Sequence, residues 1–428
     1  MQKRYALRRH LAGAVAARTG DEMSGPALLL AGFALAGSAV DASSLLACIT
    51  VSAAVGGPVL GALLDRAGRP GRLLASALAL YAAGLGAILL GLGRLPFAAT
   101  LAVAVVTGLL GPALSGGWTA QLADVVRSED LSRATTFDAM TFGAATLAGP
   151  ALAGVAAQTL GAPTAVLAAA ALIATAVPAA WLLPARHRGA PDAGPSSAGS
   201  PADRPAGPGP SDAGFPHAPP GTGSSGAGSS VVRDLAAGMR VIAGRPALAR
   251  ATFTSVVCCV AQGMLVACVP LLGAEVLGGA GRGAVLLSCT AVSGLAANAV
   301  LARFPLALAP DTIVRAGALV QAAALALAAA GGPAVLVVAA LVAGVGEGPQ
   351  LAALFAVRHR ESPDRLRGQI FTTGASMKTT GYALGAAVAG PPAARSLTAA
   401  LSLAAGVAAL AALAAAVPRA AVPRGDLP

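Results

Sequence analysis

Charged side chains interrupt several long apolar stretches of the sequence, and their types are the ones that could do chemistry. Arg18, Asp21 and Glu22 interrupt the first stretch, and Glu347 and Lys378 interrupt two late ones. A charge inside a bilayer costs about 2.5–3.5 kcal/mol on insertion scales, so such a residue usually faces a cavity or a partner. The chemistry that these residues suggest is proton binding or contact with a polar part of a substrate.

Arg18 precedes Asp21 by three residues and Glu22 by four, a spacing that brings side chains together on a helix. If the helix begins near residue 11, the two acids lie about 15 Å along it, near the middle of a membrane. We favour this arrangement, in which one acid binds a proton beside a substrate path and Arg18 adjusts its protonation. The alternative is a helix that begins at Met23, which leaves all three residues at the interface; residues 23–40 are just long enough to span.

Glu347 and Lys378 fall near the middle of the predicted helices 333–357 and 368–390. Pro349 cannot donate a backbone hydrogen bond, so we expect a kink there that leaves a carbonyl for a ligand or ion. Two interpretations stay open. The two side chains form a structural ion pair, or one or both of them meet substrate or a proton.

The composition indicates an integral membrane protein. The chain of 428 residues is 56% hydrophobic and only 11% charged, against about 25% charged in soluble proteins. Its apolar residues come in runs of about 20, the length of a membrane-spanning helix. The net charge of +11 is spread over short loops and only 3% of residues are aromatic, which argues against nucleic-acid binding. The twelve predicted spans are 11–37, 43–64, 72–92, 96–123, 134–157, 162–184, 249–274, 283–302, 312–329, 333–357, 368–390 and 395–417.

The spans divide six and six around a change in composition. Residues 185–230 are rich in Pro, Gly, Ser and Ala and predict a disordered linker. Residues 231–245 predict a short amphipathic helix on the cytoplasmic membrane surface, with Val231, Leu235, Met239 and Ile242 on one face. The predicted domains are an N-terminal bundle (1–184), this linker, this helix, a C-terminal bundle (249–417) and a tail (418–428).

The basic residues set the orientation. Of the 29 Lys and Arg residues, 24 fall on the side of the N-terminus, and only Arg94, Arg282 and Arg395 fall on the other side. The positive-inside rule then places both termini and the linker in the cytoplasm. Because lysine is scarce and Ala, Gly, Pro and Arg are abundant, we expect a GC-rich bacterial genome and a plasma-membrane protein.

We find no arrangement that predicts an enzyme. The five cysteines lie in apolar stretches without metal-ligand spacing, so we expect no metal site. All four histidines, His10, His187, His217 and His359, fall in predicted loops or tails. There is no phosphate-binding G-x-x-x-x-G-K-[ST] loop, so ATP is not the expected energy source.

A short charged loop joins the second and third predicted spans. Its sequence, from Gly61 to Arg72, is GALLDRAGRPGR. It resembles the signature loop of the major facilitator superfamily, G-x-L-a-D-r-x-G-r-k-x-x-l, although Pro70 replaces the usual basic residue and Arg72 supplies a nearby charge. The residues of this gating motif are Gly61, Asp65, Arg66, Gly68, Arg69 and Arg72.

The resemblance implies an all-α membrane fold of twelve helices in two six-helix bundles, each with nested repeats, that rock about a central site. It implies that Asp65 contacts the start of the eleventh helix, near Arg367 and Gly368, when the cytoplasmic side is closed. Gly143, Gly149-Pro150 and Gly154 partly match the glycine-proline motif of the family's antiporters, which favours export.

The resemblance also places other polar groups near the central cavity. Gln121, Gln262 and Gln350 are candidates to bind substrate, with interhelical hydrogen bonding as the alternative; Trp118 is either a cavity or a packing residue. For Asp138, about one turn into the fifth span, we expect a structural role near a helix N-terminus.

The sequence therefore predicts a monomeric secondary transporter that exports a small hydrophobic compound, such as a drug or secondary metabolite. It would be driven by the proton gradient and need no cofactor. The alternatives are uptake of a metabolite and a membrane sensor that keeps the fold without transport.

Overall fold

The computed structural model describes residues 2–36, 39–185, 227–304 and 308–416, and these ranges are almost entirely helical. The first six long segments are α1 (Gln2–Ala36), α2 (Ala39–Arg66), α3 (Pro70–Gly91), α4 (Phe97–Gly108), α7 (Leu131–Leu160) and α8 (Ala162–Trp181). The last six are α10 (Pro246–Glu275), α11 (Ala284–Arg303), α12 (Pro310–Ala329), α13 (Pro333–Glu361), α14 (Arg367–Arg395) and α15 (Leu397–Ala416). Most of the predicted linker and all of the predicted tail 418–428 lie outside the described residues.

Within the described ranges, ten helical segments are long and apolar enough to cross a membrane. α1 and α14 are equally long but less apolar, because they carry the intramembrane charges singled out above. α1 begins at Gln2 and not at residue 11, since residues 2–10 contain no Pro or Gly and include several good helix formers. α1 also continues through Met23, so a helix that begins there is wrong.

Glycine and proline mark many of the helix ends. Gly161 joins α7 to α8 with φ 92°, and Gly332 precedes α13 with φ 88°; both are in the region that only glycine adopts without strain. Pro246, Pro310 and Pro333 occupy the first helical positions of α10, α12 and α13, where the missing N–H is not needed.

The fourth span is broken, whereas the sequence predicted a continuous helix over 96–123. α4 ends at Gly108, and the chain continues through η1 (Gly111–Ala113), α5 (Gly116–Ala120) and α6 (Leu122–Val125). Pro112 has no N–H to donate, and four glycines (Gly108, Gly111, Gly116 and Gly117) lie within this stretch, so the helix is weakest here. Gly108 also lies against α2, where a Cβ atom would come within 2.4 Å of the Ile49 carbonyl oxygen.

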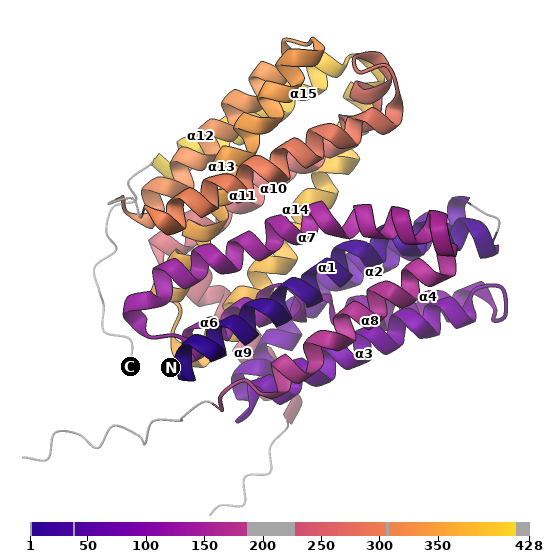
Figure 1. Cartoon of the computed structure of the whole chain (residues 1–428). Helices are drawn as coiled ribbons and strands as arrows, with labels where there is room; N and C mark the ends of the chain where they lie inside the picture. Colours follow the sequence, from indigo (N-terminus) through magenta and orange to yellow (C-terminus); the bar gives the residue numbers. More distant parts are fainter. Residues whose placement is uncertain (1, 37–38, 186–226, 305–307, 417–428) are drawn as a thin grey trace, which may run out of the picture.

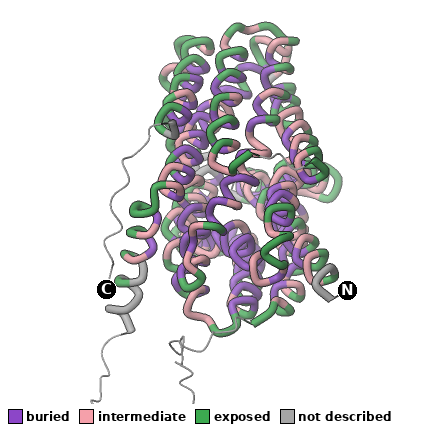
Figure 2. Tube along the Cα trace, turned by 90° about the vertical axis from the view of Figure 1, so that its left-hand side faces the viewer, coloured by how far each residue is buried: buried purple, intermediate pink, exposed green. Residues whose placement is uncertain are grey.

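The helices form two bundles, each with its own apolar core. The N-terminal core includes Leu28, Leu78, Leu85 and Trp118, and the C-terminal bundle contains several smaller clusters rich in alanine and leucine. Small residues suit a membrane bundle because they let helix backbones approach closely. Figure 2 shows buried residues along the interiors of both bundles and exposed residues on their outer faces.

The two bundles meet at one end of the molecule only. The main contacts between them join α2 to α14, α7 to α11 and α7 to α13. Figure 1 shows the bundles in contact toward the end where α9 and the N-terminus lie, and diverging toward the opposite end, at the right of the view. We call these the closed end and the open end.

The short helix α9 (Ala227–Gly244) lies at the closed end. It packs on protein, against α2, α10 and α14, and its position on the membrane surface stays a prediction. Ile242 joins Leu248, Leu366 and Ile370 in a small buried cluster, whereas Met239, predicted on the same face as Ile242, is exposed. The cluster offers α9 an apolar surface that the sequence alone does not reveal.

Candidate functional site

Asp21 and Glu22 lie deep in α1, about 28–30 Å from its first residue by helix rise. Asp21 is half-buried, and its Oδ1 accepts a hydrogen bond of 2.9 Å from the Tyr81 hydroxyl on α3. Glu22 is exposed, and its one hydrogen-bond partner among the described residues is the Thr146 hydroxyl on α7, at 3.4 Å. Adjacent acids therefore have different environments: Asp21 is held inside its own bundle, and Glu22 remains accessible.

Gly149 explains how Glu22 fits against α7. A Cβ atom at Gly149 would lie 2.6 Å from the Cβ of Glu22, so a larger residue would push α1 and α7 apart. Pro150 follows within α7 without ending the helix. The glycine-proline motif therefore packs directly against the accessible acid of α1.

Glu22 also lies close to the opposite bundle. The phenol of Tyr382 on α14 is within electrostatic reach of both Glu22 and Glu347. Glu347 on α13 and Lys378 on α14 are half-buried and within electrostatic reach of each other. They form no ion pair within 4 Å in the part of the chain that the structure describes. Carboxylates of the two bundles and one lysine thus share the region between the bundles.

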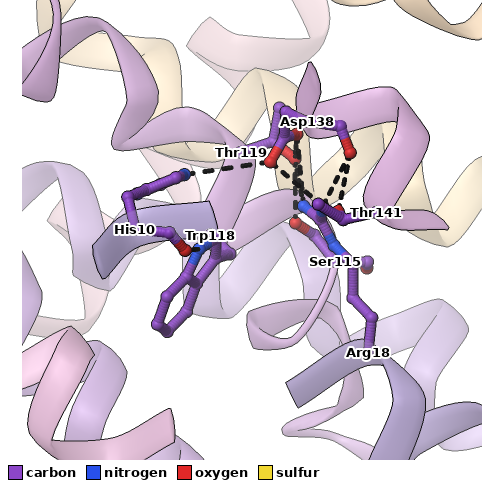
Figure 3. Close-up of polar contacts among 7 residues, drawn as sticks. All are labelled: His10, Arg18, Ser115, Trp118, Thr119, Asp138 and Thr141. Carbon is purple, nitrogen blue, oxygen red and sulfur yellow. Dashed lines mark hydrogen bonds and ion pairs between the residues drawn. The ribbon is translucent and has the colours of Figure 1, made fainter. Parts of the chain in front are cut away.

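Arg18 does not pair with Asp21 or Glu22, and the predicted pairing is wrong. Its guanidinium makes a bidentate contact with Asp138 on α7, Nη1 to Oδ1 at 3.0 Å and Nη2 to Oδ2 at 3.2 Å. Thr119 and Thr141 complete the cluster with hydroxyl contacts to Arg18, and Figure 3 shows all four side chains converging. Both charges are almost fully buried. This ion pair ties α1, α5 and α7 together.

His10 and Trp118 extend this cluster. His10 Nε2 lies 3.8 Å from Asp138 Oδ1, and the Trp118 indole donates to the His10 carbonyl at 3.1 Å. Trp118 is fully buried, so it packs and does not line a cavity. The prediction that His10 and His359 fall in loops is wrong: both lie buried in helices, α1 and α13.

The three glutamines also lie inside the bundles. Gln262 donates to Gln321 at 3.0 Å, and Gln321 donates to Gln350 at 2.8 Å, which links α10, α12 and α13. Gln350 is buried and donates to the Val314 carbonyl oxygen. Gln121 is buried too, and no hydrogen bond of its Nε2 is present in the described residues. This arrangement matches the interhelical alternative for Gln350 and Gln262.

Asp65 connects the bundles at the closed end. Its two carboxylate oxygens accept hydrogen bonds of 2.7 Å from the backbone N–H groups of Gly368 and Gln369, at the start of α14. A carboxylate at a helix N-terminus satisfies free N–H groups and interacts favourably with the helix dipole. The contact lies where the loop motif places it. The other motif residues surround the turn between α2 and α3: Gly61, Arg66, Gly68, Arg69 and Arg72.

Two further features of the closed end were not predicted. Arg367 Nη1 lies 3.6 Å from Asp124 Oδ1 of α6, an ion pair between the bundles. Arg358 on α13 is buried, and its Nε and Nη2 have no hydrogen-bond partner among the described residues. Arg358 lies next to the end of the predicted helix 333–357, and this position in the sequence does not indicate that its side chain is buried.

The geometry defines a class: a two-bundle membrane protein closed at one end, with ionisable groups between the bundles. The sequence profile of the Major Facilitator Superfamily matches residues 11–386, and the chain belongs to this superfamily. It is therefore a secondary transporter and not an enzyme, and the predicted twelve-helix fold is confirmed. No curated protein sequence matches the chain significantly.

Several solved structures share the fold at low sequence identity. The human organic anion transporter MFSD10 (TETRAN) is 16% identical with a TM-score of 0.71, over 97% of this chain and 100% of that one. A bacterial homologue of the iron transporter ferroportin, in an outward-facing state, is 15% identical with a TM-score of 0.71, over 96% and 98%. The E. coli fucose:proton symporter FucP is 15% identical with a TM-score of 0.67, over 97% and 98%.

Proposed function

We propose that this transporter exports a small hydrophobic compound in exchange for protons, in a bacterial plasma membrane with both termini in the cytoplasm. The orientation rests on the positive-inside distribution of arginine, which makes the closed end cytoplasmic and the open end external. The molecule then represents an outward-open state. Export as the direction rests on the family resemblance, which the position of Gly149 beside Glu22 supports.

The observation that carries the proposal is the environment of Glu22. It is an accessible carboxylate deep in α1, with one weak hydroxyl partner and with Tyr382 of the other bundle nearby. A charged carboxylate favours a hydrated, open site, and a protonated one can be enclosed at lower cost. A proton that arrives from outside would thus favour closure of the open end. Its release to the cytoplasm would favour return of the protein to the outward-open state.

The other groups have distinct proposed roles. Glu347 and Lys378 face the same inter-bundle region and contact the substrate or a second proton. Asp21 positions α1 through Tyr81, and Arg18 holds α7 through Asp138. Asp65, with its two N–H partners, stabilises the closed cytoplasmic end.

The test uses inverted membrane vesicles that hold a respiration-driven proton gradient, to which a panel of compounds is added while lumenal pH is followed. We expect wild type and Glu22→Asp to release protons with particular compounds and Glu22→Gln to lose the response at least tenfold. Asp21→Asn, the matched neighbour, should retain part of it. Proton release by Glu22→Gln equal to wild type would refute the role of Glu22, and protons that leave the lumen together with a compound loaded there beforehand would indicate uptake.

A further inference from the structure

A pocket separate from the inter-bundle region opens between α10 and α12. It has a volume of about 130 Å³, and Arg250, Thr254, Asp311, Thr312 and Arg315 line it. A water molecule in the liquid takes up about 30 Å³, so the pocket holds on the order of four waters or one compact polar group. The lining residues lie in the first two turns of α12 and the first three turns of α10, and both helices begin at the closed end.

The pocket carries excess positive charge. The one acidic residue of the pocket wall is Asp311. Its negative charge is neutralised by a residue outside the pocket, because Asp311 Oδ2 accepts a 2.8 Å hydrogen bond from Arg360 on α13. Arg250 and Arg315 form no ion pair or side-chain hydrogen bond within the described ranges. Two guanidinium groups from different helices therefore face one small space whose one lining acid is already paired with a third arginine.

Thr254 supplies a second and independent sign of a ligand. Its side chain is fully buried, and its hydroxyl has no hydrogen-bond partner among the described residues. Threonines in other helices bond to the carbonyl four residues earlier, as Thr107 in α4 and Thr290 in α11 do. A buried unpaired hydroxyl is uncommon because it costs free energy. This hydroxyl lies in the pocket wall, where a ligand oxygen can accept from it.

We propose that this pocket binds a phosphate group, and that the headgroup of an anionic lipid supplies it. Arginines bind phosphate oxygens by paired, charge-assisted hydrogen bonds, and Thr254 adds a neutral donor. Arg315 and Thr312 are exposed, so the pocket opens to the surface of the C-terminal bundle. Basic pockets between helices at the cytoplasmic interface are where anionic headgroups are held. The proposal does not depend on the direction or coupling of transport.

The experiment measures binding to the purified full-length protein by native mass spectrometry and by thermal stability. The probes are phosphatidylglycerol, phosphatidylcholine and inorganic phosphate, added separately. We expect phosphatidylglycerol to bind at least tenfold more tightly than phosphatidylcholine. Arg250→Gln and Arg315→Gln should each weaken it about tenfold, because a hydrogen bond to a charged group is worth about 1.5 kcal/mol or more.

Two controls separate binding from folding. Arg303→Gln removes an exposed arginine of the same bundle outside this pocket and should bind like wild type. Thr254→Val should weaken binding without lowering stability in the absence of lipid, since it removes an unpaired hydroxyl. Saturation by inorganic phosphate alone would support the site with a soluble anion as its ligand. Equal binding by wild type, Arg250→Gln and Arg315→Gln would overturn the proposal.

Discussion

At the level of single residues, the clearest contrast is between charged side chains that have an ion-pair partner and those that have none among the described residues. Arg18 and Asp138 satisfy each other in a buried site, whereas Glu22, Glu347 and Lys378 have no ion-pair partner within 4 Å among the described residues. Desolvated charges that are paired usually hold structure, and those left accessible are free to bind. The two groups should therefore respond differently to the same kind of substitution.

For the paired group, we expect Asp138→Asn to destabilise the protein. Removing one partner of a buried ion pair typically costs about 3–5 kcal/mol, because the other charge is left buried. The melting temperature of the purified protein measures this effect. The double variant Arg18→Met with Asp138→Leu should recover most of the loss, since apolar residues of similar volume replace such pairs well. A single variant as stable as wild type would contradict the pairing.

For the unpaired group, we expect Glu347→Gln and Lys378→Met to impair transport with little change in stability. No close partner is abandoned, so each should shift the free energy of unfolding by less than about 1 kcal/mol. Transport assays and melting curves on the same preparations check this. A loss of stability as large as that of Asp138→Asn would favour the structural ion pair.

Sequence alone identified charged residues inside predicted spans, but it did not identify their partners, and the roles of these residues in transport stay a prediction. The cost of intramembrane charge singled out Arg18, Asp21, Glu22, Glu347 and Lys378. It gave Arg18 the wrong partner, because neighbours on a helix are visible in sequence and the contact with Asp138, 120 residues away, depends on how α1 packs on α7.

Among the helices, the pairing of α2 with α14 determines which end is closed. Gly57 and Gly61 lie against α14, and the Ser376 hydroxyl donates to the Ala53 carbonyl at 2.7 Å. The Asp65 contact was predicted from the family resemblance of the loop, and its chemistry is that of a carboxylate that satisfies the free N–H groups of a helix start. Nothing local predicted the packing of α9, which arises from tertiary contacts, whereas Pro112 and the glycines near it are a local signal for the break after α4 that the prediction of a continuous helix did not use.

We expect Gly57→Ala to open the closed end. A Cβ atom there would lie 2.4 Å from the Thr372 carbonyl oxygen, and because backbone cannot yield as a side chain does, α2 and α14 must separate. Spin-label distances across this end should lengthen. Gly86→Ala in α3 is the matched control, since a Cβ atom there has no neighbour within 4 Å; equal distances in the two variants would argue against close packing at Gly57.

We expect Asp65→Asn to weaken the same closure more mildly. Asparagine keeps one acceptor oxygen but presents an NH₂ group to the second N–H, so one charge-assisted bond is lost. At about 1.5 kcal/mol, the population of the cytoplasm-open state should rise about tenfold, with membrane abundance unchanged. The distance distributions that test Gly57→Ala also test this variant, and an unaltered distribution would remove Asp65 from the closure.

For the whole molecule, the sequence predicted twelve helices and two bundles correctly, because bilayer thickness fixes the length of each apolar segment. It could not predict that the bundles meet at one end, since this depends on contacts between segments hundreds of residues apart. The central claim is that protonation of Glu22 is coupled to closure of the open end. That claim concerns the whole molecule, because the acid lies on one bundle and the closing surface on both.

The most direct test is a spin-label distance across the open end, between labels at Leu95 and Glu275, in lipid nanodiscs at pH 8 and pH 5. Both positions are exposed and lie at this end of their bundles. In wild type, acid should shorten the distance, because neutral Glu22 is cheaper to enclose. Glu22→Gln, which is permanently neutral, should show the short distance at both pH values. A variant with the same pH dependence as wild type would contradict the account.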